Sequence, residues 1–249
     1  MTATSRRRVV RAVAVIIPAH DEQHLLGPCL DSVHRALDHP AVRDLARVVV
    51  VVLDDCTDRS LAVAESRLRP GDLSVEIRAR NVGVARATGS AMALDRLQGL
   101  GVAPDRCWLG HTDADSTVPR GWIARQLRYS SEADAVAGVV RVDDWRDHPN
   151  IARRLFSDGY DRRKRLRLPI GSHPHVHGAN LGLRGDAYLE AGGFPGLACS
   201  EDHALWRAVA EDGRSMLATR RLWVTTSGRA TGRAPGGFAA TLADLGRAG

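Results

Sequence analysis

The stretch Val48-Val49-Val50-Val51-Val52-Leu53-Asp54-Asp55 places six apolar residues directly before two carboxylates. A strand that is apolar on both faces is typical of a parallel sheet covered by helices on each side. The two carboxylates then lie at the carboxyl end of the strand, where open α/β sheets bind their ligands. This stretch therefore predicts both the architecture and the edge of the sheet at which a site is to be sought.

Apolar runs and amphipathic segments alternate around this stretch. The predicted strands are 12–17, 48–53, 73–78 and 106–110, and the predicted helices between them are 22–37, 58–68 and 84–97. This alternation predicts an α/β fold with a doubly wound, mostly parallel sheet and a Rossmann-like N-terminal half. Four acids fall at carboxyl ends of its strands: Asp54, Asp55, Asp113 and Asp115.

The second half of the chain is less regular. Its pattern predicts a helix over 119–129, a strand over 133–140, a basic segment over 151–168, a polar loop over 171–184, a helix near 201–210 and a strand near 223–225. A Gly/Arg-rich tail occupies 227–249. Since we find no internal repeat and no clear linker, we expect one domain over 1–249, made of halves at about 12–115 and 116–226 and the tail.

Composition and charge exclude several classes of protein. The formal charge is +6, but Lys164 is the only lysine and arginine is spread along the whole chain, so we expect no nucleic-acid partner. Four cysteines without a CxxC pair favour a reduced, cytoplasmic setting over a zinc ribbon. The apolar run near the N-terminus is interrupted by Arg11 and stops at Pro18, which is too short for a signal core or a membrane span.

The stretch WLGHTDADS at 108–116 ends a predicted strand with two carboxylates one residue apart. Asp113 and Asp115 repel each other, and no lysine or arginine stands beside them in the sequence. A divalent cation resolves this conflict, because carboxylate oxygens suit Mg²⁺ and Mn²⁺. The simpler alternative is a polar turn without a ligand.

Six stretches, in this order, resemble family 2 glycosyltransferases of the GT-A fold. They are VAVIIPAHDEQHLLGPCLDSV, VVVVVLDDCTDRS, ARNVGVARATGSA, HTDADSTVPRGWI, HGANLGLRGDAYLEAGGF and SEDHALWRAVAEDG, and the resemblance runs from about Val13 to Trp223. It implies a single GT-A domain whose first half binds the nucleotide sugar and whose second half binds the acceptor. The implied activity is metal-dependent transfer of one hexose from a UDP or GDP sugar to an acceptor hydroxyl, with inversion and with Mn²⁺ or Mg²⁺.

The resemblance also implies roles for residues on the donor side. Asp115 is the expected metal ligand, and Asp113 is expected to bind the ribose or the metal and its water. Arg86 is expected to face the nucleotide and pair with phosphate. The remaining expected donor contacts lie after the first two strands: Pro18, Ala19, Glu22, Asp54 and Asp55.

Acceptor-side roles follow from the same resemblance. Asp202 is the expected general base that takes the proton of the acceptor hydroxyl, and Glu201 is its substitute. The alternative is that both are ordinary acids at a helix N-terminus, where they favour the helix dipole. His177 and Asn180 are expected near the acceptor or the sugar.

Several features depart from the family pattern or leave their role open. Cys56-Thr57 follows Asp55 where Gly-Ser is usual, and His203 follows the acid pair as a surface residue, a modulator of the base or a further metal ligand. The absence of a Gln/Arg-x-x-Arg-Trp stretch argues against a processive synthase. His173, His175 and His177 alternate and would gather around zinc if extended, although Pro174 and nearby glycines favour a loop.

Two basic segments have open roles as well. The cluster from Arg153 to Arg167 either faces an anionic acceptor or a lipid surface, which leaves peripheral membrane contact open, or is a solvated helix face. Arg229 and Arg233 either close over the diphosphate or belong to a mobile tail.

Two other functions compete with glycosyl transfer. A sugar nucleotidyltransferase would carry a Gly-rich basic loop after the first strand, where this chain has PAHDE. A catalytically silent nucleotide-sugar binder is disfavoured by the presence of Asp54, Asp115 and Asp202 together.

Overall fold

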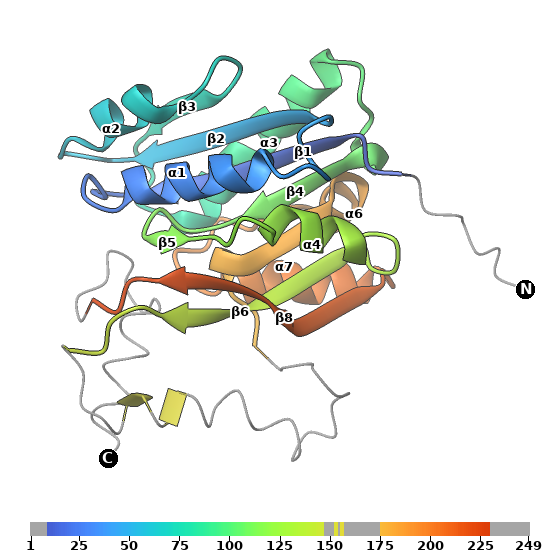
Figure 1. The fold of residues 1–249 in the computed structure, drawn as a ribbon. Coiled ribbons are helices and arrows are strands. Elements are labelled where there is room, and N and C mark those ends of the chain that lie inside the picture. Colours follow the sequence, from blue (N-terminus) through green and yellow to red (C-terminus); the bar gives the residue numbers. More distant parts are fainter. Residues whose placement is uncertain (1–8, 147–151, 154, 157–174, 230–249) are drawn as a thin grey trace, which may run out of the picture.

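One sheet of eight strands organises the molecule. In the computed structural model, which describes residues 9–146, 152–153, 155–156 and 175–229, the strand order is β3-β2-β1-β4-β7-β6-β8-β5 (Figure 1). Strands from both halves of the chain join this sheet. The division into functional halves stays a prediction, and all of the tail after residue 229 lies outside the described residues.

The first four strands in sheet order run parallel, as the sequence predicts. They are β3 (Leu73–Ile77), β2 (Ala46–Asp54), β1 (Ala12–Ala19) and β4 (Cys107–His111). The first strand is longer than expected, because Pro18 and Ala19 continue its pairing with β2 opposite Val52 and Leu53. Both residues therefore belong to the buried strand and not to the loop after it.

The sequence predicts only two of the other four strands, over 133–140 and near 223–225. The four strands are β7 (Leu181–Arg184), β6 (Ala135–Val142), β8 (Met216–Thr226) and β5 (Ser116–Thr117). Strand β7 lies antiparallel to both β4 and β6. The sequence pattern predicts a polar loop here, because these four residues include Gly182 and Arg184 and show no apolar run. Strand β8 is also much longer than the expected 223–225.

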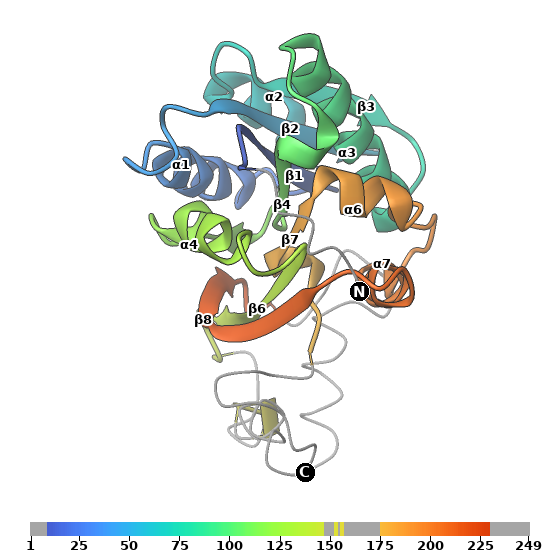
Figure 2. The ribbon, with the colours of Figure 1, turned by 90° about the vertical axis from the view of Figure 1, so that its right-hand side faces the viewer.

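Helices cover the sheet on both faces. One layer contains α1 (Leu26–Leu37), α2 (Ser60–Arg67) and α4 (Trp122–Tyr129), and the other contains α3 (Val82–Gly99), α6 (Gly185–Glu190) and α7 (Glu201–Glu211). Figure 2 shows α1 and α4 across the sheet from α3, α6 and α7. Two short 3-10 helices, Pro104–Arg106 and Gly178–Asn180, precede β4 and β7.

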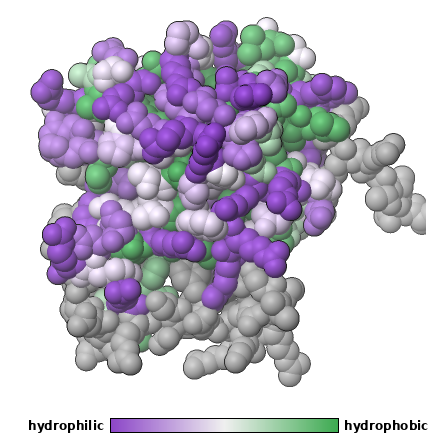
Figure 3. Space-filling model, viewed as in Figure 1, coloured by the Kyte–Doolittle hydropathy of each residue, from purple (hydrophilic) through white to green (hydrophobic). Residues whose placement is uncertain are grey.

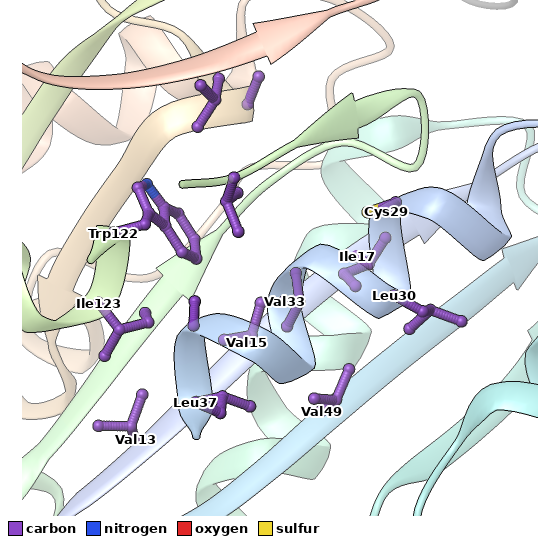
Figure 4. Packing of buried hydrophobic residues seen from close by; sticks show 14 of the residues in the cluster. Val13, Val15, Ile17, Cys29, Leu30, Val33, Leu37, Val49, Trp122 and Ile123 are labelled. Carbon is purple, nitrogen blue, oxygen red and sulfur yellow. The ribbon is translucent and has the colours of Figure 1, made fainter. Parts of the chain in front are cut away.

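The alternation of side chains along the central strands builds two hydrophobic cores. In β1, Val13, Val15 and Ile17 face α1, whereas Ala14 and Ile16 face α3. Figure 4 shows the first set against Leu30, Val33 and Leu37 of α1, with Trp122 and Ile123 of α4 alongside. Each fully buried aliphatic side chain contributes about 1.5–3 kcal/mol. A strand with both faces buried must be apolar throughout, which explains the run of valines in β2.

Gly182 gives a test of this packing. A Cβ at this position would lie 2.2 Å from Oε1 of Gln126 and 2.8 Å from Nε1 of Trp108. These two atoms form a buried hydrogen bond of 2.7 Å. We expect Gly182→Ala to lower the free energy of unfolding by about 1–3 kcal/mol, because the buried pair has no room to move.

Urea unfolding measures this effect, with Gly99→Ala at the end of α3 as the control. A Cβ at Gly99 meets nothing within 4 Å, so the control should leave stability unchanged or raise it by less than about 1 kcal/mol. Equal stabilities of the two variants would contradict the packing described.

The described helices include none that is long and apolar enough to cross a membrane. The face of the molecule in Figure 3 is mainly hydrophilic, with small apolar areas between polar side chains.

Candidate functional site

The loops after the parallel strands carry unusual backbone geometry. Asp21 after β1, Asp55 after β2 and Arg80 after β3 have φ of 51°, 52° and 47°, and Ser200 before α7 has φ of 61°. Left-handed backbone is unfavourable for residues other than glycine, and it clusters at functional sites in many proteins. All three strand-end positions lie at the carboxyl edge of the sheet, the edge that the sequence indicates.

Asp54 closes the loop after β3. Its side chain is buried and accepts hydrogen bonds from the backbone N–H groups of Ala79 (2.7 Å), Arg80 (2.8 Å) and Asn81 (2.7 Å). The neighbouring Asp55 carboxylate is partly exposed and lies 3.4 Å from Nε of Arg80. Of the two acids, Asp54 holds the loop in place and Asp55 is open to a ligand.

Asp113 shares a buried arginine with Glu201. The guanidinium of Arg86 donates from Nη2 to Asp113 Oδ1 at 2.5 Å and from Nε to Glu201 Oε1 at 3.0 Å. Arg86 is only 2% exposed and links these two acids, and its pairing with phosphate stays a prediction. Burial acts to lower the pKa of this guanidinium, but Asp113 and Glu201 outweigh that effect and raise it.

Asp115 is the most perturbed carboxyl of the site. Burial and the charge of Asp113 raise its pKa to about 6, although Arg229 acts in the opposite direction. Its Oδ1 accepts from the hydroxyl of Thr226 at 3.1 Å, and its Oδ2 lies 3.0 Å from Nη2 of Arg229. A buried acid with a raised pKa beside another acid is a typical feature of functional sites.

Arg229 joins Asp115 to the loop after β1. Its guanidinium donates to both carboxylate oxygens of Glu22, from Nη1 at 2.8 Å and from Nη2 at 2.6 Å. Glu22 is 6% exposed, and its backbone N–H donates to Ser60 Oγ at 2.7 Å. The arginine that the sequence lacks beside the Asp-x-Asp pair thus comes from the segment after β8.

Asp202 stands at the start of α7, next to Glu201. Its Oδ2 accepts from the backbone N–H of Gly178 at 2.7 Å, and its Oδ1 lies 2.9 Å from Nδ1 of His203. The charge of Arg86 also acts on it. Arg86 therefore pairs with Asp113 and Glu201, and its charge helps to lower the pKa of Asp202.

The two residues expected on the acceptor side, His177 and Asn180, lie in different environments. His177 is partly buried directly before Gly178, and its ring stacks on that of His175 with centroids 5.9 Å apart. Asn180 is fully buried, and its amide bonds Trp122, Val139 and Leu222. Asn180 is therefore not available to an acceptor, which corrects the expectation, because the strand pairing of β7 turns it into the core.

His173 lies outside the described residues, as does the basic cluster except for Arg153.

The carboxylates of the site outnumber its guanidinium groups. Arg86 and Arg229 neutralise part of a set of five clustered acids: Glu22, Asp113, Asp115, Glu201 and Asp202. A divalent cation would remove the remaining imbalance at Asp113 and Asp115. One or two carboxylates together with phosphate oxygens are a usual ligand set for Mg²⁺, so the residues present fit such an ion.

In the described part of the chain, one set of three His, Cys, Asp or Glu side chains brings its possible metal-ligand atoms within 4.8 Å of one another, and this set lies apart from Asp113 and Asp115. It consists of Asp21, Cys56 and Asp58. Asp21 accepts from the N–H groups of Thr57 and Asp58, Asp58 accepts from that of Ser60, and burial raises the pKa of the Cys56 thiol. These contacts describe a capped turn, and a protonated thiol is a poor metal ligand.

Comparison with known proteins identifies the family. The model of glycosyl transferase family 2 matches residues 14–190, more than half of the chain. The chain belongs to glycosyl transferase family 2. No curated protein matches it.

Solved structures show the fold of this family 2 member. Mannosyltransferase PcManGT from Pyrobaculum calidifontis, in complex with GDP-Man and Mn²⁺, is 20% identical with a TM-score of 0.60 over 95% of this chain and 69% of that one. The 1–349 fragment of S. aureus TarS with UDP-GlcNAc is 15% identical, with a TM-score of 0.61 over 89% and 60% of the two chains. For GalNAc-T7 with UDP, GalNAc and Mn²⁺ the values are 15%, 0.63, 95% and 47%.

The fold of this family 2 member is GT-A, as the sequence resemblance implies. The chain spans about 60% of the TarS fragment.

Sequence reasoning missed some residues that complete the site. Thr226 binds Asp115, and the backbone N–H of Gly178 binds Asp202. Neither residue carries a sequence signal, because a threonine in a strand and a glycine in a loop are common. Arg229 was noted for the diphosphate, but its contact with Glu22 was not foreseen, since the two are separated by 207 positions.

Proposed function

We propose that the protein transfers a single hexose from a UDP or GDP sugar to the hydroxyl group of an acceptor, with a divalent metal ion and with inversion at the anomeric carbon. The observation that carries this proposal is the cluster at the carboxyl edge of the sheet, where Asp113 and Asp115 lie within reach of Arg86 and Arg229 and Asp202 stands nearby. Family membership supports the reaction class, and the GDP-Man and UDP complexes of proteins with this fold support the donor class.

On the donor side, the partly exposed Asp55 is suited to bind the base, while Asp54 shapes the loop that carries Arg80. Asp115, with Asp113, would hold Mn²⁺ or Mg²⁺. Such an ion stabilises the negative charge that develops on the diphosphate leaving group. Arg229 neutralises Asp115 and Glu22 in the described structure, and a cation at Asp115 would free its guanidinium for the phosphate oxygens.

On the acceptor side, the hydroxyl must lose its proton as it attacks, and a group at the start of α7 is suited to take it. Glu201 is less suitable than its neighbour, because it is 5% exposed and already pairs with Arg86. Of the two acids, Asp202 is therefore the one suited to accept the proton of the acceptor hydroxyl. This assignment supports inversion, which requires a base on the acceptor side of the sugar.

Donor use tests the proposal directly. Release of nucleotide from a panel of UDP and GDP sugars, measured with Mn²⁺ and again with EDTA, should show one preferred donor and loss of activity with the chelator. The anomeric configuration of the product, read by ¹H NMR, should be opposite to that of the donor. Binding of a donor without any release would instead indicate a silent binder.

Metal affinity should depend on pH through Asp115. Protons compete with the metal for a carboxylate, and the pKa of Asp115 is raised to about 6. We expect the affinity for Mn²⁺ to rise by up to about tenfold per pH unit below about 6 and to level off above it. Isothermal titration of the protein with Mn²⁺ between pH 5 and pH 8 measures this, and an affinity that is constant over the whole range would contradict it.

A further inference from the structure

Glu22, Arg229 and Asp115 form a bridge of charges at the carboxyl edge of the sheet. Nη2 of Arg229 lies 2.6 Å from Oε1 of Glu22 and 3.0 Å from Oδ2 of Asp115, so one nitrogen contacts both acids. Nη1 of Arg229 donates to Oε2 of Glu22 at 2.8 Å. The guanidinium therefore holds Glu22 through both oxygens and Asp115 through only one.

This bridge is largely shielded from water. The side chains of Glu22, Asp115 and Arg229 are 7%, 15% and 25% exposed. Solvent and salt weaken exposed ion pairs much more than partly buried ones, and a buried acid that loses its partner is left with an uncompensated charge. The bridge is therefore a defined part of the site, in contrast to a casual contact between surface side chains.

The backbone that carries Arg229 is fixed. The N–H of Ser227 donates to the backbone oxygen of Asp115 at 3.1 Å, and the N–H of Gly228 donates to Oδ1 of Asp143 at 3.0 Å. These bonds tie the two residues before Arg229 to the ends of β4 and β6. The guanidinium can consequently change partners by rotation of its own side chain, without movement of the chain.

The two oxygens of Asp115 have different partners. Oδ1 accepts from the hydroxyl of Thr226 at 3.1 Å, and Oδ2 contacts Arg229. A cation that binds at Oδ2 meets the positive guanidinium at the same oxygen, and like charges at such a distance repel strongly when water is largely excluded. A divalent ion also brings twice the charge of the guanidinium to Asp113 and Asp115. The ion and Arg229 are therefore expected to exclude each other from Oδ2.

We propose that Arg229 is an exchangeable counter-ion of the donor site, which Glu22 holds in place and which yields Asp115 to a divalent cation. This inference rests on the proposed function and concerns how the same site is kept before it is loaded. Without metal, the guanidinium neutralises Asp115. With metal, Arg229 gives up Oδ2 of Asp115 and keeps its Nη1 bond to Glu22, which leaves Nη2 for the diphosphate. Glu22 is then a positioning residue for Arg229.

Titration with Mn²⁺ alone tests the exchange without turnover. Arg229→Met should raise the affinity for Mn²⁺ by about tenfold, because the ion no longer has to displace a guanidinium. Arg229→Lys should give a smaller increase, since an ammonium keeps the charge but lacks the planar fork that spans two acids. Arg221→Met, at an exposed position of β8, removes the same charge elsewhere and is the control; it should bind Mn²⁺ as the wild type does.

The diphosphate should respond in the opposite direction. In saturating Mn²⁺, the affinity for UDP or GDP, whichever the wild type prefers, should fall by about tenfold in Arg229→Met, because a charge-assisted contact with phosphate is lost. Damage to the fold would weaken the binding of both Mn²⁺ and nucleotide, and a spectator arginine would change neither. Either of these results overturns the inference, as does an absence of Mn²⁺ binding by both the wild type and Arg229→Met.

NMR spectroscopy of the full chain follows the guanidinium itself. The side-chain ¹⁵N signals of Arg229, assigned with Arg229→Lys, should shift when Mg²⁺ is added, and the shift should be absent in Asp115→Asn. Signals that stay unchanged in wild-type protein saturated with Mg²⁺ would contradict the exchange and leave the proposed function intact. Wild-type protein that releases nucleotide from no donor would instead overturn the proposed function, and the titrations with Mn²⁺ alone identify which of the two has failed.

Discussion

Asp115→Asn is expected to abolish metal-supported donor binding and to lower turnover by about 1000-fold. The substitution keeps the shape of the side chain but removes the charge of the acid that is best placed to hold a cation. A metal ion on a diphosphate contributes several kcal/mol of charge stabilisation, and each 1.36 kcal/mol corresponds to about tenfold in rate. Nucleotide release, with titration of the donor in Mn²⁺ and in EDTA, measures both effects.

The same variant should not be less stable than the wild type without metal. Because burial and Asp113 raise the pKa of Asp115, the ionised carboxylate is unfavourable in the metal-free fold at neutral pH. The neutral amide of the variant would remove that cost, so a loss of activity would not arise from unfolding. Asp44→Asn, at a side chain that is 86% exposed, is the matched control and should change neither property. Donor binding that ignores both EDTA and Asp115→Asn would mean that the Asp-x-Asp pair is only a turn.

Arg86→Met is expected to lower the free energy of unfolding by about 3–5 kcal/mol at pH 7. The guanidinium of Arg86 is the link between Asp113 and Glu201, and its removal leaves buried negative charge without a partner. Methionine fills a similar volume, so the loss would reflect charge more than packing. Urea unfolding of the variant and the wild type measures this difference in the free energy of unfolding. The method suits a fold built on one sheet with helices on both faces.

Two variants sharpen this prediction. Adding Glu201→Gln to Arg86→Met should recover part of the stability, because one of the uncompensated charges is then gone. Arg80→Met is the control, since the side chain of Arg80 is 72% exposed beside Asp55 and exposed pairs contribute about 0–1 kcal/mol. A stability of Arg86→Met within about 1 kcal/mol of the wild type would show that the acids do not depend on this arginine.

The sequence predicts some features of the sheet and misses others. The valines of β2 and the acids that follow them predicted a parallel sheet and its functional edge, because a strand buried on both faces needs an unbroken apolar run. The short strand β7 was missed, since its four residues contain no such run and it pairs with strands that are remote in sequence. The family resemblance placed Asn180 at the acceptor, and only the tertiary structure shows that its amide lies in the core.

The sequence by itself determined the alternation of strands and helices, the family and the positions of the acids at the strand ends. These features depend on local periodicity and on motifs of fixed spacing, which a single chain displays directly. Only the tertiary structure decided how the acids are neutralised. Arg86 reaches Asp113 from a helix and Arg229 reaches Asp115 from a segment more than a hundred residues away, and His203 reaches Asp202 only because α7 begins where it does. Electrostatic partners are set by distance in space, and no spacing along the chain encodes that distance.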